Sequence, residues 1–435
     1  MHKIGPVFLT ALFFCCSSLW GGTYSFYGIT DKDAISYRAN EKMIFRIQLL
    51  EDEEPVDGID LIWTRTGEDG KTEKGKAVSS SEKPLEITSS IDRPGFVRIR
   101  VEAKDSSGKP ILDSQGARLS FDGTAGADIE KIQSFPEPAD FDAFWDRQKA
   151  KLAKVPMKVK MVSVPSSDPK VECFNIKVDC AGGMPVSGYF AKPKNAKPKS
   201  LPIHISFHGA GVRSANKPIG SGRNHLALDI NAHGLENGLP DEYYKKLDQT
   251  TLHRYGRLRA EDNADPENCV WYGMVLRLIR ALEFMKSQPE WDGKNLAVSG
   301  GSQGGFQSLV AAGLDSDVSE CNVLVPWFCD VSGAAMNGRL PGSAPKWIAG
   351  LGYYDAVNHA KRIKAKTNII SALGDYSCAA SSQIVLYHCL KAPKTIKMYQ
   401  GWTHGGRMKK AAVSEMSSPA SEKEPDKARD GERNR

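Results

Sequence analysis

The sequence feature that most constrains the fold is residues 295–309, which read NLAVSGGSQGGFQSL. A short apolar run leads into a glycine cluster centred on Ser302, and apolar residues then recur at helical spacing. The segment fits the pattern G-x-S-x-G in the context that this pattern requires: a strand, a sharp turn and a helix. Glycines have a steric role there, because the two backbones approach closely only without Cβ atoms between them. We therefore expect an exposed serine hydroxyl at a strand–helix turn; a plain Gly/Ser turn is the alternative.

The chain has 435 residues, which is long enough for two domains with a full hydrophobic core. Its net charge of +6 is small for this length, and its lysines and arginines are interspersed with acidic residues. We therefore expect a globular protein that does not bind nucleic acid.

Residues 1–21 have the pattern of a secretory signal peptide, with a lysine near the start, an apolar core and small residues after it. A lipid anchor at Cys15 or Cys16 is less favoured, because two phenylalanines precede Cys15. The sequence predicts export, so we expect a secreted or periplasmic protein. No later stretch is long and apolar enough to predict a membrane span.

The cysteines do not indicate a metal site. Removing the leader takes away two of the nine cysteines, and the others are scattered through a large domain. We expect mostly buried thiols, with one disulfide bridge as an option. The sequence contains neither a CxxC nor an HExxH pattern, so we predict no metal and no cofactor.

Residues 22–124 contain short strand-like runs separated by turn-rich pieces. In 96–103, apolar and charged residues alternate, as in an antiparallel strand with one buried face. We predict a small β-sandwich of immunoglobulin-like size. Trp63 is expected in its core, and sugar stacking by Trp63 and Tyr37 is the alternative. The strands are expected at 43–50, 59–65, 85–88 and 96–103.

Residues 123–127, GTAGA, look like a linker to a catalytic domain at 125–410. A helix is expected from about Asp140, and strands then alternate with helices, which predicts an α/β domain with a mainly parallel sheet. Residues 411–435 are charged and lack apolar periodicity, so we expect a disordered tail. Strands are expected at 159–164, 171–178, 186–191, 203–207, 227–230, 322–325, 368–373 and 395–399, with a long helix at 272–287.

A serine hydroxyl is a poor nucleophile at neutral pH and needs a histidine base that is oriented by an acid. In α/β-hydrolases both partners follow the serine, with the acid first. Of the three histidines after Ser302, His404 lies just beyond the strand expected at 395–399 and is the predicted base. His388 falls in an apolar helix-like run, and His359 lies away from any strand's carboxyl end.

The predicted acid is Asp375, which follows directly after the strand expected at 368–373. Open α/β sheets gather their active residues at the carboxyl ends of their strands. Asp330, at the end of the preceding strand, is the runner-up. Asp355 is interpreted as a turn or helix-cap residue.

The oxyanion of the reaction needs two hydrogen-bond donors. The backbone N–H of Gln303, the residue after the nucleophile, is one candidate. The N–H of Ala210 is the other, because it lies in an HGAG turn after an earlier strand. His208 of that turn is interpreted as a structural histidine.

From about 141 to 406, the chain resembles the acetyl xylan esterase and cephalosporin-C deacetylase family of carbohydrate esterases. The resemblance implies an α/β-hydrolase that removes acetyl groups from xylan, xylo-oligosaccharides or small acetylated molecules. It implies Ser302, Asp375 and His404 as catalytic residues, no cofactor, and a homo-oligomer as an option that the N-terminal region could alter. The ordered matches are DFDAFW at 140–145, HG at 208–209, LDINAHG at 228–234, RALEF at 280–284, GGSQGG at 300–305, VPWFCD at 325–330, YDAVN at 354–358, GDxxC at 374–378 and His404.

The chain departs from the family pattern in three places. Ala210 stands where the family has a bulky aromatic residue, which implies a wider acyl pocket. Alanines at 379–380 replace two prolines, so the start of the following helix is less fixed. The region from 234 to 270 follows the family less closely, and the N-terminal region lies outside the resemblance.

The sequence thus predicts a secreted serine esterase acting on acetylated oligo- or polysaccharides. Two other functions stay open. A secreted peptidase of the prolyl-oligopeptidase type would share the serine turn and the order of the three catalytic residues. A non-catalytic carbohydrate-binding protein would use its N-terminal region, although the intact serine, aspartate and histidine weigh against it.

Overall fold

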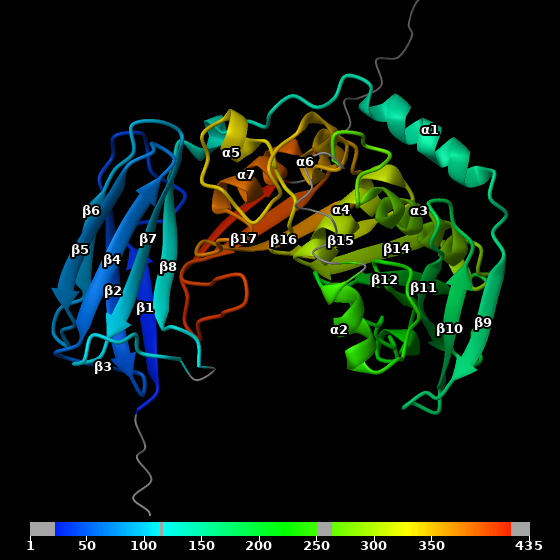
Figure 1. Ribbon diagram of the computed structural model, residues 1–435, viewed down its shortest axis with the longest axis horizontal. Coiled ribbons are helices and arrows are strands. Elements are labelled where there is room, and N and C mark those ends of the chain that lie inside the picture. Colours follow the sequence, from blue (N-terminus) through cyan, green and yellow to red (C-terminus); the bar gives the residue numbers. More distant parts are fainter. Residues whose placement is uncertain (1–21, 114–115, 251, 253–262, 419–435) are drawn as a thin grey trace, which may run out of the picture.

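The computed structural model describes residues 22–113, 116–250, 252 and 263–418. The predicted leader at 1–21 and residues 419–435 of the predicted tail lie outside the described residues. Within the described ranges, no helix has the length and apolar character needed to cross a membrane. The chain folds into an N-terminal region of two small sheets and a larger region around one long sheet (Figure 1).

The N-terminal region pairs two four-stranded antiparallel sheets in the described part of the chain. Its strands are β1 Tyr24–Thr30, β2 Met43–Glu51, β3 Glu54–Pro55, β4 Asp60–Gly67, β5 Thr72–Val78, β6 Leu85–Ser89, β7 Gly95–Lys104 and β8 Ser120–Ala127. One sheet joins β1, β2, β3 and β6, and the other has the order β5-β4-β7-β8. Apolar residues of both sheets, such as Phe45 and Ile99, share one buried core. Trp63 packs against this core, and Tyr37 is only 1% exposed, so the ring of Tyr37 is not available to stack on a sugar.

The predicted linker at 123–127 is instead the second half of β8. This segment pairs with β7 and is buried along its length. Its small residues permit close packing, since a Cβ atom on Gly126 would lie 2.7 Å from atoms of Phe96 and Ile129. A domain boundary between 124 and 125 would therefore cut a strand, and the chain leaves this region through the short helix η1, Ile129–Lys131.

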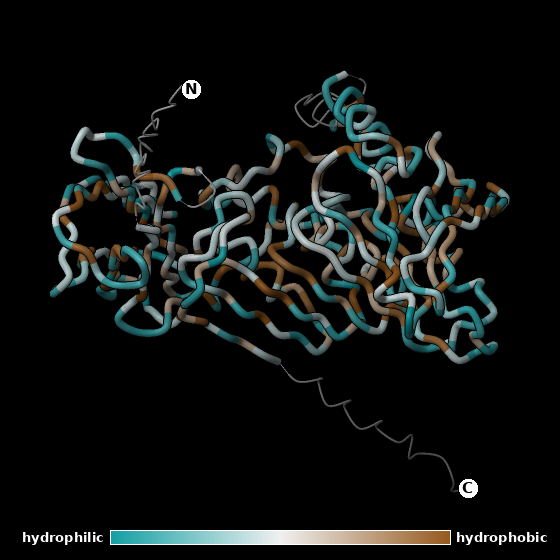
Figure 2. Tube along the Cα trace, turned by 90° about the horizontal axis from the view of Figure 1, so that it is seen from below, coloured by the Kyte–Doolittle hydropathy of each residue, from teal (hydrophilic) through white to brown (hydrophobic). Residues whose placement is uncertain are grey.

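Among the described residues, the larger region contains a ten-stranded mixed sheet in the order β18-β17-β16-β15-β14-β12-β13-β11-β10-β9. The run from β17 to β13 is parallel, and the strands at both edges are antiparallel to their neighbours. Figure 2 shows apolar segments along the middle of this sheet. The strands are β9 Val159–Val164, β10 Val171–Val178, β11 Val186–Pro193, β12 Leu201–Phe207, β13 Leu226–Ile230, β14 Trp291–Gly301, β15 Glu320–Leu324, β16 Lys366–Ala372, β17 Lys394–Tyr399 and β18 Val413–Ser418.

A row of helices packs along this sheet, with α3 against α4, α4 against α6 and α6 against α7 (Figure 1). Helix α1 turns its apolar stripe of Phe141, Phe144, Trp145 and Leu152 into the core, as the sequence predicts. The alternation of strands and helices therefore gives the expected α/β architecture. The helices are α1 Phe141–Ala153, α2 Asp241–Gln249, α3 Tyr272–Lys286, α4 Gln303–Leu314, α5 Gly333–Met336, α6 Ala356–Ala360 and α7 Ala380–Cys389, with 3₁₀ segments η2 Ser221–Arg223 and η4 Ala349–Tyr353.

The prediction of a disordered tail from 411 onward is wrong for the first part of that segment. Strand β18 pairs with β17 along its whole length and forms one edge of the long sheet. Its burial alternates weakly, with Ser414 as its buried residue. Backbone hydrogen bonds rather than apolar side chains thus hold this strand, which is why the residue pattern did not reveal it.

Candidate active site

Ser302 lies at the turn between β14 and α4, as the sequence predicts. Its φ and ψ angles are 54° and −119°, a conformation that residues with a Cβ atom rarely adopt. Two backbone hydrogen bonds hold the turn. The Ser302 N–H donates to the carbonyl of Leu324 at 2.9 Å, and the Trp327 N–H donates to the carbonyl of Ser302 at 3.0 Å. The turn is thereby fixed to the carboxyl end of β15.

The glycines around Ser302 are required to different degrees. A Cβ atom on Gly304 would lie 2.0 Å from the carbonyl oxygen of Phe207, and one on Gly300 would lie 2.4 Å from the backbone of Gly304. A Cβ atom on Gly301 would have its nearest neighbour at 3.7 Å, an ordinary contact. Helix α4 thus starts directly against the ends of β12 and β14, which leaves the serine at the apex of the turn.

His404 connects Ser302 to Asp375 through two hydrogen bonds. Its Nε2 lies 2.9 Å from Oγ of Ser302, and its Nδ1 lies 2.8 Å from Oδ2 of Asp375. The aspartate follows β16 and the histidine follows β17, so both loops lie at the carboxyl ends of parallel strands. The three side chains predicted from the sequence therefore meet at one edge of the sheet.

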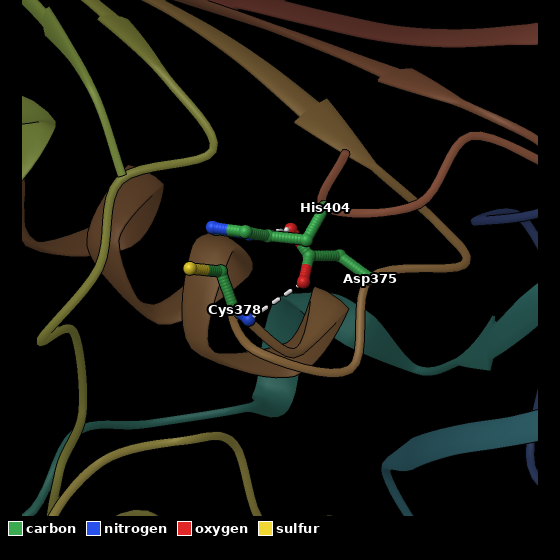
Figure 3. Close-up of side chains that lie close together, drawn as sticks. All are labelled: Asp375, Cys378 and His404. Atoms are coloured by element: carbon green, nitrogen blue, oxygen red, sulfur yellow. Dashed lines mark hydrogen bonds and ion pairs between the residues drawn. The ribbon is translucent and has the colours of Figure 1, made fainter. Parts of the chain in front are cut away.

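Asp375 is held as a hydrogen-bond acceptor. It is 3% exposed, and its Oδ1 accepts the N–H of Ser377 at 2.7 Å. The same oxygen accepts the N–H of Cys378 at 2.9 Å (Figure 3). The hydrogen bond from His404 to this carboxylate raises the pKa of His404, and partial burial opposes the shift. With the Nδ1 proton on the carboxylate side, Nε2 of neutral His404 is free to accept the Ser302 hydroxyl proton. The two N–H donors in the turn after Asp375 were not foreseen from the sequence.

The HGAG turn containing Ala210 lies beside the serine turn. A Cβ atom on Gly209 would lie 3.5 Å from the carbonyl oxygen of Gly301. The side chain of Gln307, on α4, donates to the carbonyl of His208 at 3.1 Å and so ties the two turns together. Sequence reasoning missed this contact, although Gln307 lies one helical turn after Gln303. The N–H of Gln303 begins α4, where the first N–H groups have no acceptor within the helix.

Three other histidines of the described residues have packing or hydrogen-bond partners away from Ser302. His208 is 5% exposed, its Nε2 accepts the N–H of Ala232 at 3.2 Å, and burial lowers its pKa to about 4. His359 is fully buried, which lowers its pKa to about 3, and one of its ring nitrogens lies 3.1 Å from the carbonyl of Tyr353. His388 lies 3.0 Å from the carbonyl of Ile132. These positions agree with the preference for His404.

The alternative acids also have other partners. Asp330 lies 3.1 Å from the guanidinium of Arg339, yet burial raises its pKa to about 8. Asp355 caps α6 by accepting the N–H of Val357 at 3.1 Å, and it also accepts the N–H of Asp330 at 2.9 Å. The expected cap role of Asp355 is therefore confirmed.

Cys378 brings a third ligand-type side chain to the acid–base pair (Figure 3). Its thiol and the ligand atoms of Asp375 and His404 all lie within 4.8 Å of one another. However, the facing atoms of Asp375 and His404 are hydrogen-bonded to each other, and burial raises the pKa of the thiol well above its usual value. A neutral thiol is a weak metal ligand, so this cluster suits proton transfer better than metal binding.

The thiols of the described residues are all free. They are Cys173, Cys180, Cys269, Cys321, Cys329, Cys378 and Cys389, and all but Cys180 are buried. The expectation of mostly buried thiols is confirmed, and none of the described cysteines forms the bridge that was considered.

A mixed ten-stranded sheet with a serine at a strained strand–helix turn defines the α/β-hydrolase class. The family model described as Acetyl xylan esterase (AXE1) matches residues 129–337 and 341–416, and the chain therefore belongs to this family. It is a carboxylic ester hydrolase of the carbohydrate esterase type. The family match begins at residue 129, so the two N-terminal sheets lie outside it.

Individual relatives agree with this assignment. The chain is 27% identical over 338 residues to acetyl esterase Axe7A of Xylanibacter ruminicola, covering 74% of each chain. The structure of an acetyl xylan esterase from Paenibacillus sp. R4 has a TM-score of 0.53 and 26% identity, over 64% of this chain and 94% of that one. Acetyl xylan esterase 1 from Thermoanaerobacterium sp. JW/SL YS485 has a TM-score of 0.51 and 22% identity, over 65% and 93%, and supports the fold.

Proposed function

We propose that this protein is an exported serine esterase that removes acetyl groups from xylan, xylo-oligosaccharides or small acetylated molecules. The observation that carries the proposal is the unbroken hydrogen-bond chain from Ser302 through His404 to Asp375, with distances of 2.9 and 2.8 Å. Membership of a carbohydrate esterase family supports the reaction class, and the acetyl group follows the names of the relatives.

The proposed reaction has two halves. Oγ of Ser302 attacks the ester carbonyl carbon while Nε2 of His404 takes its proton, and the backbone N–H groups of Gln303 and Ala210 stabilise the oxyanion. The bond to the sugar oxygen then breaks, and His404 returns the proton to that oxygen. Asp375 holds the imidazole in the required tautomer and stabilises its charged form. Water, activated by His404, attacks the acetyl-serine and releases acetate.

The other parts of the proposal rest on separate observations. Export rests on the leader pattern at 1–21. An immunoglobulin-like class for the N-terminal region is supported by two antiparallel sheets around one core. The peptidase alternative is not favoured, because the family and the curated relative are esterases. A non-catalytic role would leave the hydrogen-bonded serine, histidine and aspartate without a purpose.

The test is the variant Ser302→Ala, assayed with p-nitrophenyl acetate and by acetate release from acetylated xylan. We expect turnover to fall by about 10⁴-fold or more, because the nucleophile is lost. Ser287→Ala, at the end of α3, is the matched control and should keep wild-type turnover. Unchanged turnover in Ser302→Ala, or faster turnover of dipeptide amides than of acetyl esters by the wild type, would contradict the proposal.

A further inference from the structure

Strands β7 and β8 of the N-terminal region lie against the two loops that carry Asp375 and His404. Figure 1 shows β8 facing the end of β17, from which the His404 loop departs. The contacts between them involve the residues immediately before and after the candidate acid and the residue that opens the histidine loop. The N-terminal region therefore contacts both loops through β7 and β8.

The first contact is a backbone one. A Cβ atom on Gly374 would lie 2.2 Å from the carbonyl oxygen of Asp122, so the backbone of Gly374 packs directly on β8. The N–H of Gly374 also donates to the carbonyl of Trp402 at 2.9 Å. Gly374 thus joins the acid loop, the histidine loop and β8 at one point, next to Asp375.

The second contact is a pair of hydrogen bonds between Gln400 and Thr124. The N–H of Thr124 donates to Oε1 of Gln400 at 3.1 Å, and Nε2 of Gln400 donates to the carbonyl of Thr124 at 2.9 Å. Gln400 is 1% exposed, so its amide has no water to replace these partners. It lies four residues before His404 and fixes the start of the histidine loop to β8.

The third contact is a stacked arginine. The guanidinium of Arg98, on β7, lies over the ring of Tyr376, and that of Arg100 lies 5.3 Å from the centre of the same ring. Arg98 is 9% exposed, so the cation–π contact is largely shielded from water. Because Tyr376 directly follows Asp375, this contact limits movement of the acid loop.

We propose that β7 and β8 form the rear wall of the active site, with Arg98 and Gln400 as positioning residues for Asp375 and His404. The inference rests on the proposed function, since it takes these two residues as acid and base. It assigns the N-terminal region a part in catalysis, in contrast to a separate binding module.

The test uses the full-length variants Arg98→Met and Gln400→Met with p-nitrophenyl acetate. We expect kcat to fall by about tenfold or more while KM stays within about twofold, because small displacements of catalytic groups slow the chemical step more than binding. The rate at which a fluorophosphonate labels Ser302 should fall in parallel with kcat. Both rates are expressed per folded molecule, from the folded fraction measured by circular dichroism at the assay temperature.

Two controls make the same chemical changes elsewhere. Gln148→Met removes a buried glutamine of α1 that donates to Glu267, ahead of α3, at 3.0 Å and accepts the hydroxyl of Tyr272, on α3, at 2.8 Å. Arg65→Met removes a buried arginine whose partner Asp69, at 2.7 Å, lies within the N-terminal region. Both should lower thermal stability and leave kcat per folded molecule near the wild-type value.

The outcomes separate the inference from the proposed function. Wild-type kcat per folded molecule in both Arg98→Met and Gln400→Met, or an equal loss in the two controls, would overturn the positioning role. A wild-type protein without acetyl ester turnover, or a fully active Ser302→Ala variant, would instead refute the proposed function. Loss of kcat confined to Arg98→Met and Gln400→Met would support the inference.

Discussion

The serine turn and the acid and histidine loops opposite it are held in place in different ways. Ser302 is fixed by its own neighbours, because Gly300 and Gly304 let β12, β14 and α4 come into backbone contact. Asp375 and His404 lie on loops that pack against β7 and β8. These two strands precede the loops by more than 200 residues in the chain. The position of Ser302 thus depends on local steric constraints, whereas the positions of Asp375 and His404 depend on contacts between regions.

This difference indicates where the protein tolerates change. A turn encoded by adjacent glycines fails when one of those glycines gains a side chain. Loops held by distant partners fail gradually, because each hydrogen bond or stacked ring contributes only part of the restraint. The following predictions test this contrast, from the largest expected effect to the smallest.

Asp375→Asn should have the largest effect, lowering kcat by about 10⁴-fold, because the amide favours the wrong tautomer of His404. The matched variant is Asp330→Asn, at the alternative acid. Burial raises the pKa of Asp330 to about 8, so an amide resembles its neutral form and kcat should stay within about threefold. Steady-state kinetics of both variants show whether Asp375 or Asp330 is the acid. A larger loss of kcat in Asp330→Asn than in Asp375→Asn would reverse the assignment.

Gly304→Ala should lower kcat by about 100-fold, because its Cβ atom would lie 2.0 Å from the carbonyl oxygen of Phe207 and must displace the serine turn. Gly301→Ala is the control in the same turn. Its Cβ atom would be 3.7 Å from its nearest neighbour, so kcat should change by less than about threefold. Similar kinetics for the two variants would show that backbone contact does not set the serine position.

The pH dependence of kcat/KM should follow His404, which acts as a base only when neutral. The hydrogen bond to Asp375 raises the pKa of His404 above its usual 6.5. Activity should therefore fall by about tenfold per pH unit below that raised pKa and level off above it. A profile measured with p-nitrophenyl acetate whose acid limb has its midpoint below 6.5 would contradict this environment for the imidazole.

The smallest predicted effect concerns stability at the rear wall. Burial raises the pKa of Asp122 from 3.8 to about 7, so its contribution to stability is present at acidic pH and is lost as the pH rises through about 7. Asp122→Asn cannot ionise and should lack this loss. The difference in melting temperature between Asp122→Asn and the wild type, variant minus wild type, should be about 2 °C larger at pH 8 than at pH 5. An unchanged difference between the two pH values would mean that Asp122 is not held neutral.

The sequence predicted the serine turn, the three meeting side chains and most central strands, because each has a strong local signal. Buried parallel strands are apolar throughout, and the glycines identify the turn directly. It failed at β8, where Gly123 and Gly126 suggested a linker. Those small residues instead permit close packing against the side chains of Gln400 and Phe96. A residue pattern cannot distinguish a flexible glycine from one required by a close neighbour.

Strand β18 and the support of the two loops escaped prediction for a related reason. β18 is held by backbone hydrogen bonds to β17, which any sequence can form. The amide of Gln400 meets a backbone 276 positions away, and no local pattern encodes such a partner. The candidate catalytic side chains were therefore foreseeable, but the contacts that hold them were not.

The paired hydrogen bonds of Gln400 bear on how this enzyme can be rebuilt. A truncated esterase that begins at α1 would expose the amide of Gln400 and the backbone of Gly374 to solvent. Both loops would then lose the contacts that position them. In a chimera with another hydrolase, β7, β8 and the loops after β16 and β17 should all be taken from the same parent protein.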